Sequence, residues 1–174
     1  YHHTLTEYKK AKAKLFQNIA NSLKKAGIPK AAILNKQDPS WSFFAKIPVP
    51  IVYFYKIGGQ PKNKAEIVAQ KVVPDAKGIS FQLVGPYGTI KINSSLLGKF
   101  NLENTLASAS VGIALNIPLE KIKEGLESIK LIPGRLEPVN LGQNFVVIID
   151  YAHTPDALQK LYQTVKPLCS GRII

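Results

Sequence analysis

Methionine is absent from the 174 residues of the chain, even at the first position, and cysteine occurs once, as Cys169. A single cysteine excludes an internal disulfide bond, so we expect a cytoplasmic setting. No apolar run approaches the ~18 residues of a membrane-spanning helix, so no membrane span is expected. The first residues are polar and do not resemble a secretory signal peptide. The missing methionine, and an ending on GRII that is typical of the first half of a buried strand, predict a piece of a larger protein.

Acidic residues are scarce: 11 Asp and Glu stand against 23 Lys and Arg, which gives a net charge of +12. The imbalance is strongest over residues 1–36, where eight lysines face the single acid Glu7. Such a surface attracts anionic ligands such as nucleotides or nucleic acid, although a solvated lysine-rich helix face has the same composition. Aromatic residues do not alternate with the basic ones to form a stacking platform, so no nucleic-acid partner is expected.

Hydrophobic spacing predicts a long amphipathic helix over residues 4–26, ended by Gly27 and Pro29. The residues three or four positions apart along it are Leu5, Tyr8, Lys12, Leu15, Ile19 and Leu23. The other expected elements are strands over 31–35 and 49–55, a β-hairpin of 78–84 and 88–93, helices over 101–115 and 118–129, strands over 136–142 and 144–150, and a helix over 154–166.

The alternation of strands and helices indicates an α/β fold, with a mostly parallel sheet flanked by helices and a small β-hairpin subdomain. The IPGRLE stretch interrupts the pattern, so we expect a domain boundary there, with residues 1–134 in one domain and 135–174 in the next. Helix starts are expected at Asn101 as N-cap, at Pro118 in a first turn, and at Thr154 as N-cap before Pro155.

Asp150 and His153 follow the apolar run FVVII, which predicts a strand buried on both faces. Ligands of open α/β sheets bind outside the carboxyl ends of the strands, where a carboxylate accepts hydrogen bonds from ribose hydroxyls or holds a metal ion. The alternative for Asp150 is a turn or capping aspartate, although Thr154 is already expected to cap the next helix. The alternative for His153 is a structural hydrogen bond.

Four polar residues elsewhere are further candidates. Asn101 and Asn104 are three apart at a helix start, where two amides suit the donor and acceptor edge of adenine, or serve as an N-cap and a surface residue. Arg135 at the expected hinge suits a phosphate, or a surface salt bridge. Lys12 faces inward on the predicted helix, which is unusual for lysine unless it is paired or modified, or its side chain reaches the solvent.

Five stretches, in order, resemble the Mur ligase family along essentially the whole chain. They are YHHTLTEYKKAKAKLF, AILNKQDP, LLGKFNLENTLAS, IPGRLE and DYAHTPDAL. The closest similarity is to members that add the third residue of the peptidoglycan stem peptide. The resemblance implies the later part of a central ATPase-type domain, followed by the first βα unit of a Rossmann-like C-terminal domain.

The resemblance also implies a reaction and its partners. ATP phosphorylates a carboxylate of UDP-N-acetylmuramoyl-L-Ala-D-Glu, and the amino group of a diamino acid, meso-diaminopimelate or L-lysine, attacks the acyl phosphate. Positioning and electrostatic stabilisation carry such chemistry. The setting would be the bacterial cytoplasm, with Mg²⁺ as the metal ion.

By resemblance, Asn101 and Asn104 contact adenine, and Asp150 binds the ribose with Tyr151 beside it on the nucleotide. Arg135 approaches the phosphates.

By resemblance, His153 lines the nucleotide side of the cleft. Lys12 is carbamylated, which turns a cation into a carboxylate-like ligand for Mg²⁺.

The chain departs from the family pattern at several points. The glycine-rich phosphate-binding loop is absent, His2 does not match the family's magnesium-binding histidine, and Gln37 stands where the family has an aspartate. The chain alone is therefore not expected to complete catalysis. The alternatives are a cyanophycin or folylpolyglutamate type of ligase, which usually carries Asn where this chain has Thr154, and a non-catalytic degenerate homologue.

Overall fold

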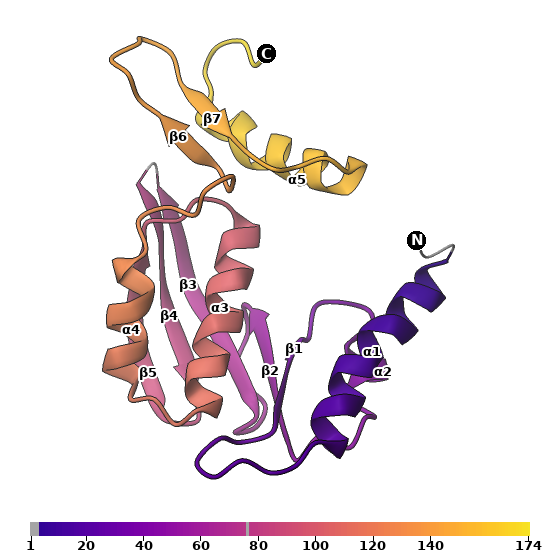
Figure 1. Ribbon diagram of the computed structural model, residues 1–174. Helices are drawn as coiled ribbons and strands as arrows, with labels where there is room; N and C mark the ends of the chain where they lie inside the picture. The colour runs from indigo at the N-terminus through magenta and orange to yellow at the C-terminus, as the bar shows by residue number, and fades with distance from the viewer. Residues whose placement is uncertain (1–3, 76) are drawn as a thin grey trace.

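The computed structural model describes residues 4–75 and 77–174 (Figure 1). Its helices are α1 (Leu5–Asn21), α2 (Trp41–Phe44), α3 (Lys99–Ala114), α4 (Leu119–Ser128), α5 (Pro155–Val165) and the 3-10 turn η1 (Lys166–Leu168). Its strands are β1 (Ala31–Asn35), β2 (Ile51–Ile57), β3 (Glu66–Asp75), β4 (Gly78–Gly85), β5 (Gly88–Ser94), β6 (Glu137–Val139) and β7 (Val147–Ile149). Within these ranges, no helix is both long and apolar enough to cross a bilayer.

The first five strands form one sheet in chain order. The strands β1, β2 and β3 are parallel, whereas β3, β4 and β5 are antiparallel. The α/β class is therefore confirmed, and the sheet is mixed, with its parallel part confined to β1–β3. The predicted hairpin is present as β4 and β5, but its description as a separate subdomain is wrong. It extends the central sheet because β3, which the sequence analysis did not predict, pairs with both β2 and β4.

The main core lies between this sheet and helices α3 and α4, which cover one of its faces (Figure 1). Burial of this apolar surface is the main force that stabilises the layers. The fully buried or nearly buried members are Ile67, Ala69, Ile79, Phe81, Leu83 and Ile92 from the strands, and Leu102, Leu106, Ala109, Ile113 and Ile122 from the helices. The two helices approach closely at Gly112, where an added Cβ would lie 2.8 Å from the side chain of Ile122.

Helix α2 packs on the opposite face of the sheet, and α1 packs on α2. Trp41 meets Phe54 of β2 edge to face at 5.5 Å between ring centroids. Phe16 of α1 meets Phe44 of α2 at 5.2 Å. These aromatic contacts fix the short helix between β1 and the longer helix.

Helix α1 is shorter than predicted and packs through another face. It ends at Asn21, and Thr4 caps its start by accepting the backbone N–H of Glu7 at 3.1 Å. Ala13 is buried, while most of the larger residues of the predicted apolar stripe are exposed, with Leu5 85% and Leu15 61% accessible, and Ile19 is half-buried. The spacing of the large apolar residues therefore identified the helix correctly but selected the wrong face.

A second unit follows residues 129–136 and consists of the antiparallel pair β6–β7 and helix α5. Thr154 is the N-cap of α5, as predicted, and accepts the N–H of Ala157 at 3.3 Å. The prediction of a buried strand before Asp150 is wrong for this chain, since Ile149 of β7 is 50% exposed. The final GRII stretch does not form a strand. In the described ranges β6 and β7 pair only with each other. The apolar residues of β7 and of the GRII stretch therefore do not lie within a larger sheet.

Candidate functional site

The carboxylate of Asp150 fastens the end of β7 to residues 132–136, the segment between the two units that is called the hinge below. Its Oδ2 accepts the backbone N–H of Leu136 at 2.9 Å, and its Oδ1 accepts that of Ala152 at 2.8 Å. The backbone N–H of Tyr151 donates in turn to the carbonyl of Gly134 at 2.9 Å. Asp150 is thus a turn aspartate. Each carboxylate oxygen retains acceptor capacity, because an ionised carboxylate offers about four lone-pair sites.

Tyr151 and His153 form an exposed ring pair beside this junction. Nδ1 of His153 lies 2.7 Å from the carbonyl oxygen of Tyr151, and the two rings meet edge to face at 4.7 Å. Because a carbonyl oxygen only accepts, Nδ1 must carry the proton, and Nε2 is the acceptor of the neutral ring. The structural hydrogen bond expected as the alternative for His153 is therefore present, and Nε2 is the atom through which the ring would meet a ligand.

The hinge itself is a tight turn that displays Arg135. The N–H of Arg135 donates to the carbonyl of Ile132 at 3.0 Å, while Gly134 and Leu136 adopt positive φ angles of 68° and 49°. Leu136 is a buried non-glycine residue in a conformation that costs free energy, which the hydrogen bond to Asp150 offsets. The Arg135 side chain is exposed.

Asn101 is not an N-cap. Helix α3 begins at Lys99 with Gly98 as its cap, and the Nδ2 of Asn101 donates back to the carbonyl of Leu97 at 2.8 Å. Its side chain is fully buried, and its Oδ1 has no hydrogen-bond partner among the described residues. Asn104 is exposed, so the two amides do not present one shared surface. An unpaired buried acceptor costs free energy, so the orphaned Oδ1 is a feature that a ligand donor would relieve.

A cleft of about 540 Å³ lies between the sheet, the start of α3 and helix α5. It is at the carboxyl ends of β2 and β3, where α/β sheets bind ligands. Most of its lining is apolar, and Asp75, Lys99, Glu103 and Lys160 bring charges to it. A hydrogen bond from Lys160 to Asp156, 2.7 Å long, raises the pKa of Lys160 above its usual value.

None of the predicted site residues is among the residues that line this cleft. Gly98 at its edge connects α3 to the second unit, since an added Cβ would lie 3.0 Å from Thr164 of α5 and 3.1 Å from Leu136 of the hinge. Sequence reasoning missed Lys99 and Lys160. Lys99 lies within the LLGKFNLENTLAS stretch, two residues before Asn101, so its place in that stretch was the available signal. Lys160 follows the DYAHTPDAL stretch and carried no such signal.

Lys12 does not face inward, so that prediction is wrong. Its side chain is exposed, and its ammonium group lies 5.1 Å from the ring centroid of Tyr8. Figure 1 shows α1 beside α2, away from strands β6 and β7. The described part of the chain holds no cluster of three or more His, Cys, Asp and Glu side chains that fits a metal ion. His2 lies outside the described residues.

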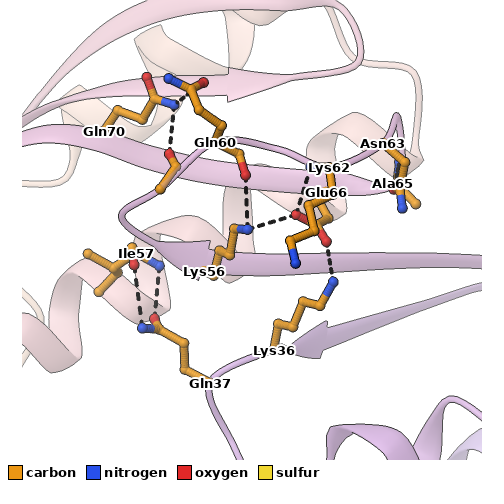
Figure 2. Close-up of polar contacts among 11 residues, drawn as sticks. Lys36, Gln37, Lys56, Ile57, Gln60, Lys62, Asn63, Ala65, Glu66 and Gln70 are labelled. Atoms are coloured by element: carbon orange, nitrogen blue, oxygen red, sulfur yellow. Dashed lines mark hydrogen bonds and ion pairs between the residues drawn. The ribbon is translucent and has the colours of Figure 1, made fainter.

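A buried glutamate, missed in the sequence, organises the carboxyl ends of β1 and β2 (Figure 2). Glu66 is 1% exposed and pairs with Lys36 and, at 2.8 Å, with Lys56. The backbone N–H of Lys62 donates to it at 3.0 Å. Burial alone would raise the pKa of Glu66, but these hydrogen bonds outweigh it and lower the pKa to about 2. The signal in the sequence was a glutamate at the start of the apolar stretch of β3, together with lysines at the ends of β1 and β2.

Gln37 stands where the resemblance expects an aspartate, and it has a structural role. Its Oε1 accepts the backbone N–H of Ile57 at 2.8 Å, which fastens the end of β1 to the end of β2 (Figure 2). Asp38, the aspartate retained in this stretch, accepts the N–H of Ser40 at 2.7 Å and shapes the turn into α2. The departure at Gln37 therefore preserves the local turn.

A mixed sheet with helices on both faces, a cleft at its strand ends and a second unit of β6, β7 and α5 define a two-unit α/β protein. The model of the Mur ligase middle domain matches residues 1–112. The chain belongs to the Mur ligase family.

Two curated relatives are UDP-N-acetylmuramoyl-L-alanyl-D-glutamate–2,6-diaminopimelate ligases. That of Bacillus licheniformis is 39% identical over 173 residues, which is 99% of this chain and 34% of the relative. That of Geobacter metallireducens is 39% identical over 176 residues, which is 100% of this chain and 33% of the relative. The chain therefore spans about a third of the length of these relatives.

Solved structures show the same fold. A ligase with the same printed name matches with a TM-score of 0.73 and 30% identity, over 95% of this chain and 33% of that one. The folylpolyglutamate synthase of Mycobacterium tuberculosis, solved with ADP and AMPPCP, matches with a TM-score of 0.70 and 20% identity, over 95% of this chain and 36% of that one. The latter identity supports the fold alone. The predicted resemblance to the Mur ligases is confirmed.

Proposed function

We propose that the full-length protein is an ATP-dependent ligase that joins a diamino acid to UDP-N-acetylmuramoyl-L-Ala-D-Glu in the bacterial cytoplasm. The observation that carries this proposal is the 39% identity to a diaminopimelate ligase over 99% of the chain. It favours 2,6-diaminopimelate over L-lysine as the amino acid. Because the chain spans a third of its relatives, we propose that it is inactive alone.

ATP is proposed to bind where the two units meet, around the start of α3 and the hinge. Asn104 is exposed there and would contact adenine. Asn101 would contribute beside it; its acceptor oxygen has no partner among the described residues but is fully buried, so contact with the base requires the start of α3 to open. Residue 135 begins the second domain in this proposal.

The junction at Asp150 would meet the rest of the nucleotide. The carboxylate retains acceptor capacity for a ribose hydroxyl, and Tyr151 offers an exposed ring beside it. Arg135 would approach the phosphates, because its planar fork matches their oxygens. Nε2 of His153 would face the nucleotide side of the cleft.

In the proposed reaction, a substrate carboxylate takes the terminal phosphoryl group of ATP and releases ADP. The amine then attacks the acyl carbon, an amide bond forms, and phosphate leaves. The residues of this chain would act by holding and orienting ATP. Such positioning accelerates phosphoryl transfer by large factors.

The described residues do not themselves form a site for Mg²⁺. They offer no cluster of three candidate ligands, and Lys12 would serve as a ligand only as a carbamate. Its exposure leaves the amine open to carbon dioxide. Mg²⁺ would neutralise phosphate charge.

The test is ADP release by the full-length protein with UDP-N-acetylmuramoyl-L-Ala-D-Glu, supplied with diaminopimelate or with L-lysine. We expect release only when both substrates are present, and faster with diaminopimelate. In a calorimetric titration, Asn104→Ala should weaken ATP binding about tenfold. Asn18→Ala, an exposed asparagine on α1, is the matched control. An enzyme that ignores the muramoyl dipeptide, or equal ATP binding by both variants, would contradict the proposal.

A further inference from the structure

A second hollow, of about 220 Å³, lies on the other side of the loop that precedes α3. Three cationic residues line it, and none of its lining residues is acidic. The lining comprises Lys77 from the β3–β4 turn, Ser95, Leu96 and Leu97 from the loop before α3, and Lys130, Leu131, Arg135, Leu136 and Pro138 from the hinge segment. Three separate segments thus bring positive charge to one place.

The carboxylates closest to these cations in the sequence accept hydrogen bonds from neutral N–H groups and form no ion pair with the three cations in the described part of the chain. Asp75 accepts the backbone N–H of Lys77 at 2.6 Å and lines the other cleft. Glu127 turns to β5, where it accepts the backbone and side-chain N–H groups of Asn93 at 2.7 and 3.2 Å. Glu137 accepts a backbone N–H of the hinge turn at 2.8 Å. Each acid is therefore used by a neutral donor.

Within the described part of the chain, none of the three cations forms an ion pair with these or other carboxylates. The ion pairs found among the described residues involve other lysines. The ammonium of Lys130 donates to the carbonyl of Glu127 at 2.8 Å, which is a neutral acceptor. Like charges around one hollow repel each other, and a bound anion would offset this repulsion.

We propose that Lys77, Lys130 and Arg135 form a binding site for a phosphate group. Three cations suit a multiply charged anion better than a single carboxylate, and the fork of an arginine matches two phosphate oxygens. At about 220 Å³ the hollow is smaller than the roughly 300 Å³ at which pockets for whole small molecules begin, so it takes the group and not a nucleotide.

The phosphate has two possible sources. One is free inorganic phosphate. The other is the phosphate end of a nucleotide whose base lies in the 540 Å³ cleft, since Leu97 lines both hollows. Only the second source rests on the proposed function. In either case the anion would connect the β3–β4 turn to the hinge and hold the two units in a fixed arrangement.

The test is calorimetric titration of the full-length protein with inorganic phosphate, and separately with ATP. The variants are Lys77→Gln, Lys130→Gln and their double, with Lys91→Gln on β5 as the matched control because Lys91 is exposed and outside the hollow. Circular dichroism checks that each variant is folded.

Each single change should weaken binding about tenfold, and the control should not change it. Loss of phosphate binding in the two variants supports a site for free phosphate. Loss of ATP binding alone supports the nucleotide as the source. If neither titration differs between the double variant and Lys91→Gln, the proposed site does not exist. Because the phosphate titration needs no ligase activity, it can succeed where the proposed function fails.

Discussion

Replacement of Glu66 by glutamine should destabilise the chain strongly at neutral pH and hardly at all in acid. The pKa of Glu66 falls from 4.5 to about 2 on folding, because Lys36, Lys56 and the N–H of Lys62 outweigh the effect of burial. This difference of about 2.5 pH units corresponds to about 3 kcal/mol of folding free energy. The glutamine side chain keeps the shape but leaves two partly buried ammonium groups without an anion.

The sign of the pH dependence follows from the direction of the shift. Because the folded-state pKa lies below the unfolded one, the contribution of Glu66 is fully present above about pH 4.5. It is lost as the pH falls toward about 2. The stability difference between wild type and Glu66→Gln should therefore be about 3 kcal/mol at pH 7 and shrink below pH 4.5.

The assay is urea unfolding followed by the fluorescence of Trp41, the single tryptophan of the chain, at pH 7, 5 and 3. Trp41 is a local reporter, since the ammonium of Lys36 lies 5.6 Å from its ring centroid. A variant that replaces Lys36, Lys56 and Glu66 together by methionine, methionine and leucine should recover much of the loss. Equal midpoints for wild type and Glu66→Gln at pH 7, or a deficit that is the same at pH 3, would refute the reasoning.

Four further substitutions test the packing around the site by thermal unfolding. Gly125→Ala in α4 should raise the free energy of unfolding by about 1 kcal/mol through helix propensity, because no atom lies within 4 Å of the added Cβ. Gly112→Ala in α3 should give no such gain, because its Cβ would lie 2.8 Å from the side chain of Ile122. Equal gains in the two variants would contradict the close approach of α3 and α4. Thr154→Ala should cost about 1 kcal/mol by removing the cap of α5, and no loss would mean that this end is capped by water. Gly98→Ala should lower the free energy of unfolding by more than 1 kcal/mol, because φ is 87° and the added Cβ would lie 3.1 Å from the side chain of Leu136. An unchanged unfolding midpoint would show that the loop relaxes.

Local signals in the sequence predicted the local structure well. Thr154 followed by Pro155 marks a helix start whose reasons lie within one turn, and the structure contains it. The hairpin was equally local, with two strand patterns around Pro86 and Tyr87. The α/β class and the family followed from the order of such elements. None of these inferences required knowledge of what packs against what.

The predictions that failed concern side chains whose position depends on tertiary packing. Lys12 was placed on a buried face because the large residues of α1 recur around it, yet the helix packs through the small Ala13 instead. Asn101 has the residue type of an N-cap, but a glycine at 98 lets the helix start earlier and draws the amide inside. Strand β3 escaped notice because Glu66, a charged residue, opens it and only its lysine partners make burial possible.

Asp150 shows why a structural and a functional role need not compete at one residue. Its two oxygens each accept one backbone N–H, and these bonds hold Leu136 in its positive-φ conformation and fix the turn that displays Arg135. The remaining lone pairs lie at the same junction where ATP is proposed to bind. A ligand hydroxyl that bonds this carboxylate would therefore act on the group that sets the hinge. Nucleotide binding and the arrangement of the two units would then be coupled through one side chain, because the same carboxylate takes part in both.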